Sequence, residues 1–114
     1  MEKTPKPYLA YILETLQLIR ENTPADKAIF MSDPNARDAT LMRLHDIGEQ
    51  LNRLRDSFPD FYDRYRTDDW SELIGLRNII SHGYGEIEFE KIWLVVNENL
   101  PSFTKQVQAV IRGM

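Results

Sequence analysis

Hydrophobic residues recur along this chain at intervals of three and four, the spacing that places side chains on one face of an α-helix. No segment alternates apolar and polar residues as a half-buried strand would. The pattern therefore predicts an all-α protein. Thr4 and Pro5 fit an N-cap and a first-turn residue for a helix over residues 5–22. The apolar face of this helix consists of Leu9, Ile12, Leu13, Leu16 and Ile19.

A second helix is predicted over residues 35–57, after a connection that contains Pro24 and Pro34. The connection has room for one or two helical turns, docked by Phe30. Gly48 lies within the apolar stripe of the second helix. Because glycine lowers helix propensity, we interpret Gly48 as a point where a neighbouring helix approaches closely. The stripe itself consists of Leu41, Leu44, Ile47, Leu51, Leu54 and Phe58.

The second half of the chain predicts two further helices. Pro59 ends the preceding helix, and an aromatic connector with Phe61, Tyr62 and Tyr65 is expected to pack over the end of the bundle. The next helix begins near Trp70, where Asp69 and Glu72 resemble a capping box, and it ends at Gly83.

A last helical pattern covers residues 89–111, with a break near Asn99 caused by Pro101. Short connections favour antiparallel neighbours. We therefore expect a single domain over residues 1–114, an up-and-down bundle of four main helices plus a short or split one.

Composition and charge narrow the possible functions. Hydrophobic residues make up 42% of the 114 residues and charged residues 28%, as in ordinary globular domains. No apolar run is long enough to cross a bilayer, and the first residues lack the apolar stretch of a signal peptide, so we expect a cytoplasmic protein without a membrane partner. The absence of cysteine excludes disulfides and thiolate metal sites. No metal or cofactor site is expected.

The net charge of −4 argues against a protein that coats nucleic acid with a uniformly basic surface, so any RNA contact needs a local patch. Seven arginines and no lysine occur from Arg37 to Arg77, but nine acidic residues share that segment. Solvated helix faces explain most of these charges. Arg77 alone is singled out as a candidate functional arginine.

The segment from Arg77 to Tyr84 carries the candidate chemistry. An arginine neutralises phosphate and a histidine transfers protons near neutral pH, so Arg77 and His82 together suit phosphodiester cleavage without a metal. Asn78 lies one helical turn before His82 and is expected to orient the imidazole. On an ideal helix Arg77 and His82 point about 140° apart, so they converge only if the helix relaxes at Gly83 or the arginine side chain bends.

Simpler structural roles remain open at these positions. Arg77 has possible ion-pair partners in Glu72 and Glu49, and His82 suits the C-terminal end of a helix. Glu49 is expected either to orient Arg77 or to be solvated. His45, the only other histidine, is assigned an ordinary boundary position.

This segment has an arginine, four further residues, a histidine, one further residue and a tyrosine. The pattern resembles the signature of the HEPN superfamily in its HepT-like toxin branch. The resemblance extends over most of the chain in the expected order, through Asp38-Ala39, Leu44, Ile47-Gly48-Glu49, Trp70, Gly75-Leu76-Arg77-Asn78, Ile92-Trp93 and Asn99-Leu100-Pro101. It implies a metal-independent endoribonuclease toxin of a HepT/MntA-type toxin–antitoxin pair, neutralised by a nucleotidyltransferase antitoxin, with tRNA as a first candidate substrate.

The same resemblance implies a role for each residue of the motif. Arg77 and His82 are the expected catalytic residues, and Tyr84 is the expected acceptor of adenylyl groups from the antitoxin. One histidine does not easily perform both proton transfers, so a homodimer that brings two copies of the segment into one cleft is expected. The products would be a cyclic 2′,3′-phosphate and a 5′-hydroxyl. The alternatives are a non-catalytic HEPN module that binds a nucleotide or a nucleotidyltransferase, and a structural interaction bundle.

Overall fold

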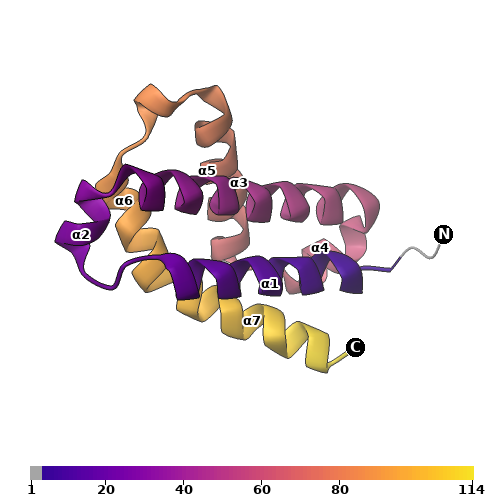
Figure 1. The fold of residues 1–114 in the computed structure, drawn as a ribbon. Coiled ribbons are helices and arrows are strands. Elements are labelled where there is room, and N and C mark those ends of the chain that lie inside the picture. The colour runs from indigo at the N-terminus through magenta and orange to yellow at the C-terminus, as the bar shows by residue number, and fades with distance from the viewer. Residues whose placement is uncertain (1–3) are drawn as a thin grey trace.

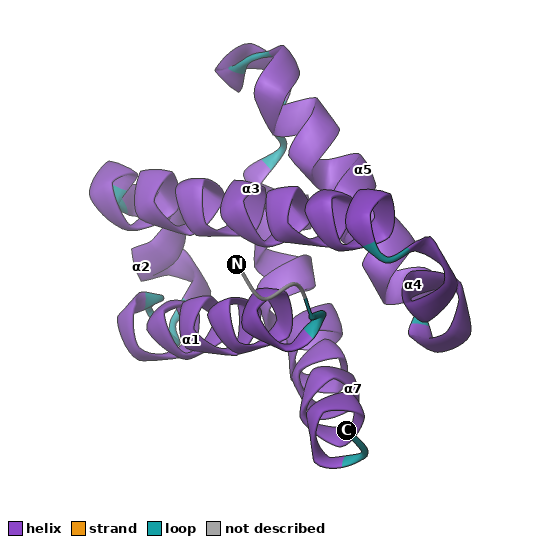
Figure 2. Ribbon diagram, turned by 90° about the vertical axis from the view of Figure 1, so that its right-hand side faces the viewer, coloured by secondary structure: helices purple, strands orange, loops and turns teal. Residues whose placement is uncertain are grey.

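The computed structural model describes residues 4–114, which form helices and short turns without a strand (Figure 2). The prediction of an all-α bundle is therefore confirmed. Residues 1–3, which belong to the predicted domain and to the start of the chain considered for a signal peptide, lie outside the described residues. Within residues 4–114 no helix is long and apolar enough to span a membrane. The elements are α1 (Lys6–Asn22), α2 (Lys27–Ser32), α3 (Pro34–Ser57), α4 (Pro59–Tyr65), α5 (Asp68–His82), the 3₁₀ turn η1 (Tyr84–Glu86), α6 (Phe89–Leu94), the π-helical turn η2 (Val95–Asn99) and α7 (Leu100–Arg112).

The four long helices enclose one apolar core. α1 and α3 lie side by side and run in opposite directions, α7 lies along α1, and α5 runs across α3 (Figure 1). The apolar stripes predicted for the first two helices face inward, and Leu9, Ile12, Leu44 and Leu51 are completely buried. α5 carries Arg77 to His82, and Tyr84 follows in η1. The extensive packing of α5 against α3 fixes the position of this segment.

The helix boundaries agree with the sequence analysis to within a few residues, but the first cap differs. The N-cap of α1 is Pro5, without a side-chain hydrogen bond, so Thr4 does not have the expected capping role. The expected docking by Phe30 is confirmed, because α2 places this ring in the core, 5.3 Å from the ring of Trp93 between centroids. α3 begins at Pro34, where the Asp33 carboxylate accepts a hydrogen bond from the backbone N–H of Ala36.

The connector after Pro59 is a helix, which the sequence analysis did not predict. Proline lacks an N–H donor, so Pro59 ends α3 and also fits the first position of α4. The expected packing of this aromatic segment is confirmed, because Tyr62 is buried against the ring of Trp70 at 5.6 Å between centroids.

The capping box predicted from Asp69 and Glu72 is wrong. The N-cap of α5 is Thr67, and neither carboxylate caps the helix. Asn99 instead donates hydrogen bonds to both, at 3.1 Å to Asp69 and 3.3 Å to Glu72, and Gln106 donates to Asp69 at 3.0 Å. These two carboxylates therefore attach α5 to the C-terminal part of the chain.

The predicted break in the last helical segment is confirmed. It consists of a π-helical turn, which is wider than a turn of α-helix. Val95–Asn99 forms a π-helical turn, in which the N–H of Leu100 donates to the carbonyl of Val95. Pro101 supplies no N–H, so a regular α-helical ladder cannot pass through this point. The chain continues as α7 without leaving the helical path.

Candidate functional site

Gly48 brings α3 and α5 into contact at Arg77. A Cβ atom at Gly48 would meet the Cβ of Arg77 and would lie 2.8 Å from the carbonyl oxygen of Leu73. No side chain fits between the two helices there. The prediction that Gly48 permits close helix approach is therefore confirmed, and the residue approached is the candidate catalytic arginine.

The Arg77 guanidinium is held by two side chains. Its Nε donates to Oε1 of Glu49 at 3.1 Å, and its Nη2 lies 2.9 Å from the same oxygen. Its Nη1 donates to Oδ1 of Asn78 at 3.2 Å. A guanidinium has five N–H groups, so these three contacts leave about two free for a phosphate. The Arg77 side chain is 29% exposed, which makes those groups accessible.

Glu49 is placed between two arginines. Its Oε2 accepts a hydrogen bond from Nε of Arg53 at 3.3 Å, while Oε1 faces Arg77. Partial burial by itself would raise the pKa of the Glu49 carboxyl, but the hydrogen bonds and charges of Arg53 and Arg77 outweigh it and hold that pKa below its ordinary value. Of the two roles left open for Glu49, orientation of Arg77 is the one that this geometry supports.

The interhelical ion pair also decides between the partners considered for Arg77. Glu49 is the partner, whereas Glu72 accepts a hydrogen bond from Asn99 at the other end of α5. The ion pair does not exclude a role in phosphate binding, because it uses one edge of the guanidinium only. It fixes the arginine in one orientation before any ligand arrives, as a preorganised anion site requires.

Asn78 contacts a different residue from the one expected. The sequence analysis assigned the Asn78 side chain to His82. Its amide oxygen Oδ1 instead accepts a hydrogen bond from Arg77, and among residues 4–114 no side-chain hydrogen bond joins Asn78 to His82. The geometry thus makes Asn78 a support for the guanidinium. This contact follows from the bend of the Arg77 side chain toward α3, which the sequence spacing does not specify.

His82 is the last residue of α5 and is exposed to solvent. The helix continues through His82 and turns only at Gly83, whose φ of 147° suits glycine. The relaxation that would bring Arg77 and His82 together before Gly83 is therefore not seen. Arg77 faces α3, while the imidazole of His82 is open to a second molecule.

Two further contacts between the motif and α3 were not predicted. Nε2 of His45 lies 2.9 Å from Oγ of Ser81, and the Tyr84 hydroxyl donates to Oδ1 of Asp38 at 2.9 Å. His45 is therefore part of the α3–α5 contact and more than a simple boundary residue. The partners in both pairs are far apart in sequence, and no local pattern connects them.

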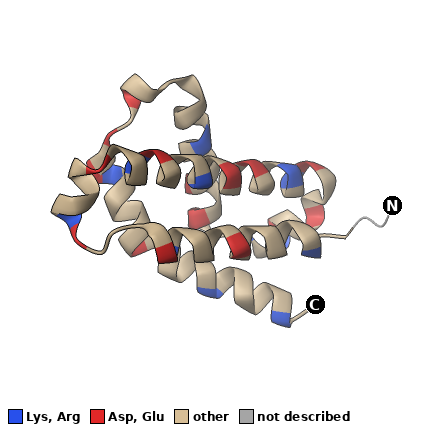
Figure 3. Cartoon of the chain, in the orientation of Figure 1, with Lys and Arg blue, Asp and Glu red and all other residues tan. Residues whose placement is uncertain are grey.

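The surface around the motif carries both charges and apolar side chains. Basic and acidic residues are interspersed along α3, in agreement with the net charge of −4 (Figure 3). Met42 on α3 is 74% exposed and Ile79 on α5 is 46% exposed. Each lies three residues before a histidine, one helical turn from His45 and His82 respectively. Exposed apolar residues beside a polar site are typical of surfaces that bind another protein.

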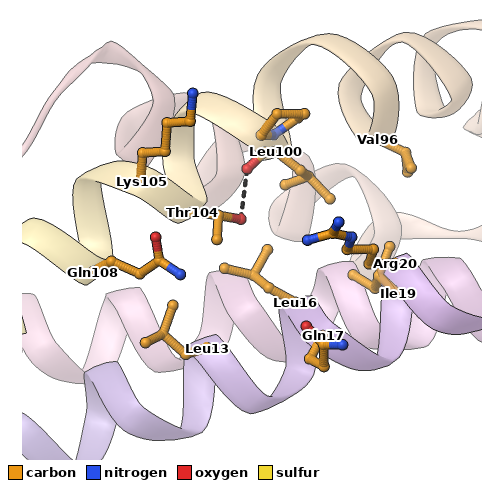
Figure 4. A pocket seen from close by; sticks show the side chains of 11 residues that line it. Leu13, Leu16, Gln17, Ile19, Arg20, Val96, Leu100, Thr104, Lys105 and Gln108 are labelled. Atoms are coloured by element: carbon orange, nitrogen blue, oxygen red, sulfur yellow. Dashed lines mark hydrogen bonds between the residues drawn. The ribbon is translucent and has the colours of Figure 1, made fainter.

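A groove of about 570 Å³ lies elsewhere, between α1, η2 and α7 (Figure 4). Leu16, Leu100 and neighbouring apolar side chains line it, with Arg20 and Lys105 as its charged residues. None of the residues from Arg77 to Tyr84 takes part. The candidate site is therefore an open surface on α3 and α5, separate from this groove.

The all-α fold and the position of Arg77, His82 and Tyr84 at the end of α5 agree with the HEPN class that the motif resembles. The sequence model of the family described as Ribonuclease HepT-like matches residues 12–110. The chain belongs to this family, which confirms the resemblance noted from the motif.

Named relatives agree with this assignment. The chain is 32% identical over 106 residues to "Putative RNase MJ1380" of Methanocaldococcus jannaschii, covering 92% of this chain and 94% of the relative. It is 29% identical over 114 residues to "Putative RNase TTE0752" of Caldanaerobacter subterraneus subsp. tengcongensis, covering 96% of each. "Probable ribonuclease HepT" of Thermococcus cleftensis is 27% identical over 106 residues, with 90% of this chain and 91% of the relative covered. The comparison with solved structures gave no significant match.

Proposed function

We propose that this protein is a metal-independent endoribonuclease that acts as the toxin of a toxin–antitoxin pair. The observation that carries the proposal is the Arg77 guanidinium, fixed by Glu49 and Asn78 with free N–H groups, on the helix that ends in the exposed His82. Membership of the HepT-like ribonuclease family supports it.

The chemistry follows from what RNA already supplies. The ribose 2′-hydroxyl beside the scissile phosphate is the nucleophile, and His82 takes its proton as the oxygen attacks phosphorus. Arg77 stabilises the negative charge on the phosphorane through its free N–H groups. The 5′-oxygen leaves with a proton from a second acid. The products are a cyclic 2′,3′-phosphate and a 5′-hydroxyl, and no metal ion is required for any of these steps.

The second acid is the reason to propose a homodimer. The segment from Arg77 to Tyr84 offers one histidine per chain, and His82 is exposed at the end of α5, so a second chain is the proposed source of the second acid. A twofold dimer that places the two α5 ends together would supply two histidines and two arginines to one cleft. The exposed Met42 and Ile79 next to the motif support an interface on this surface.

A nucleotidyltransferase antitoxin is the proposed regulator of this site. Tyr84 is 55% exposed and lies two residues beyond His82, within reach of another enzyme. Transfer of an adenylyl group to its hydroxyl would place a negatively charged phosphate and a nucleoside beside Arg77 and His82. The added group would compete with RNA for the same positive charge. tRNA is the first substrate to test.

A non-catalytic module that docks on a nucleotidyltransferase is the second candidate function. The exposed apolar residues beside the motif favour it in the same way as they favour a dimer. The two functions differ in one requirement, since a docking module does not need the imidazole of His82 to transfer protons.

The decisive experiment measures RNA cleavage by the purified protein in the presence of EDTA. The parent should cleave, and Arg77→Ala and His82→Ala should each abolish cleavage and growth inhibition while circular dichroism stays unchanged. Arg64→Ala, which removes an exposed arginine of α4, is the matched control and should cleave like the parent. Loss of cleavage with EDTA would exclude the metal-free mechanism. Parental cleavage by both site variants would exclude the proposed site, whereas a folded parent that does not cleave RNA would favour the docking module.

A further inference from the structure

The Tyr84 hydroxyl has a carboxylate as its hydrogen-bond partner at the molecular surface. It donates to Oδ1 of Asp38 at 2.9 Å, from η1 to the first turns of α3. Both residues are exposed, so the contact contributes little to the core and remains accessible to a second enzyme. Asp38 is the one hydrogen-bond acceptor of this phenol among residues 4–114.

We propose that Asp38 is the proton acceptor when Tyr84 is adenylylated, an inference that rests on the modification proposed above. The phenolic oxygen attacks the α-phosphorus of a nucleoside triphosphate held by the partner enzyme. A new oxygen–phosphorus bond forms, the bond from the α-phosphorus to the bridging oxygen breaks, and pyrophosphate leaves. The phenolic proton passes to the Asp38 carboxylate and from there to water. Asp38 touches the reacting oxygen, so it is a catalytic residue of the modification.

The state of the phenol explains why an acceptor is needed. The hydrogen bond to Asp38, with partial burial and the carboxylate charge, raises the pKa of Tyr84 above its ordinary value, against a smaller opposite effect of Arg37. The phenol is therefore neutral at physiological pH, and a neutral phenol is a poor nucleophile. Its proton must leave as the bond to phosphorus forms, and a carboxylate already hydrogen-bonded to it is the group placed to receive it.

Neighbouring side chains fix the position of the phenol. The ring of Tyr84 packs on that of Phe89 at 5.7 Å between centroids, and the guanidinium of Arg37 lies 4.7 Å from the centre of the Phe89 ring. Nη1 of Arg37 donates to the carbonyl of Met31 at 3.0 Å, which attaches the start of α3 to α2. Phe89, and Arg37 through Phe89, are thus positioning residues for the Tyr84 ring.

The experiment compares the rates at which the cognate nucleotidyltransferase, with Mg-ATP, adds mass to the Tyr84 peptide of the full-length protein. Asp38→Asn keeps an oxygen that accepts the phenolic hydrogen bond but cannot take the proton. It should slow the first addition by about 10²-fold or more. Raising the pH should narrow this difference, because hydroxide then removes the proton in both proteins.

A matched control exists on the same helix. Asp46 accepts a hydrogen bond from the hydroxyl of Tyr11, an equivalent carboxylate–phenol pair away from the motif. Asp46→Asn should leave the rate of Tyr84 modification at the parental value. Circular dichroism of both variants establishes that each is folded.

The outcomes separate this inference from the function on which it rests. A parent that is modified, with Asp38→Asn modified equally fast, would overturn the role of Asp38 alone. A ratio between the two rates that does not change with pH would also overturn it, because a purely structural contact predicts that result. A parent that is neutralised without added mass on the Tyr84 peptide would show that the proposed modification is wrong, and the role of Asp38 would fall with it.

Discussion

The backbone of Gly48 lies directly against the β-carbon of Arg77, so α3 and α5 are in close contact at the candidate catalytic residue. This contact predicts that Gly48→Ala separates the helices and displaces the guanidinium. We expect a loss of stability of about 1–3 kcal/mol from overpacking, together with reduced RNA cleavage. Urea unfolding and a cleavage assay measure the two effects.

Gly75 supplies the control for this substitution. It lies on α5, and a β-carbon there would meet no atom within 4 Å. Gly75→Ala should therefore stabilise the protein, by up to about 1 kcal/mol through helix propensity, and leave cleavage unchanged. Equal effects of the two substitutions would show that the close approach at Gly48 has no special role.

The Glu49–Arg77 ion pair predicts a stability difference that depends on pH. The folded protein holds the pKa of Glu49 below its ordinary value of 4.5, so the unfolded chain binds the proton more readily. The stabilisation is present above pH 4.5 and is lost as the pH falls through the lower, folded-state pKa. Glu49→Gln should accordingly lower the free energy of unfolding by about 1 kcal/mol at neutral pH and by less in acid.

The exposed ion pair of Arg66 and Asp63 is the control for Glu49. Its atoms are 3.9 Å apart, and the Asp63 side chain is 74% exposed. Solvent screens such a pair, so Asp63→Asn should change stability little at any pH. A Glu49→Gln effect of the same size in acid and at neutral pH would contradict the assigned cause.

The exposed apolar residues beside the motif predict where two copies meet. Met42→Glu and Ile79→Glu should each weaken the dimer and lower cleavage at a given protein concentration, because they place a charge in an apolar contact. Light scattering coupled to gel filtration measures the mass. Ile29→Glu is the control for the added charge, since Ile29 is 56% exposed but lies on α2 and not on α3 or α5. It should leave the mass and the cleavage unchanged. A fully active monomer would contradict the composite site.

Tyr84 should be dispensable for cleavage and required for neutralisation by modification. Tyr84→Phe removes the hydroxyl and its bond to Asp38 but keeps the ring against Phe89. We expect this variant to cleave RNA and to gain no adenylyl group when co-expressed with the nucleotidyltransferase. Intact-mass spectrometry and growth curves report the two properties. Added mass on the variant would place the modified residue elsewhere.

Local patterns predicted the parts of the fold that local forces determine. The apolar stripes placed the long helices, and Gly48 marked a helix contact because only glycine lets two backbones approach so closely. Failures occurred where distant side chains compete for the same group. Asp69 and Glu72 have the spacing of a capping box, but their carboxylates accept hydrogen bonds from Asn99 and Gln106 instead.

In the candidate site, too, local features were predictable and contacts between distant residues were not. The residue types from Arg77 to Tyr84 were sufficient to indicate the chemistry, whereas their partners on α3 were not predictable. Asp38 and Tyr84 are 46 residues apart, and His45 and Ser81 are 36 apart. Such pairs depend on how α5 crosses α3, which no periodicity within either helix specifies. Asn78 was assigned to His82 because helical spacing allowed it, but its side-chain amide oxygen accepts a hydrogen bond from the guanidinium of Arg77.

The turn at Gly83 fixes the length of the segment between Arg77 and Tyr84. A residue inserted within α5 before this turn would rotate His82 by about 100° around the helix relative to Arg77 and advance it by about 1.5 Å. The φ of 147° at Gly83 would then fall to a side-chain-bearing residue or move out of register with α3. Insertions and deletions between these positions are therefore expected to inactivate the protein even when every motif residue is retained. Motif searches should treat the spacing as part of the signature.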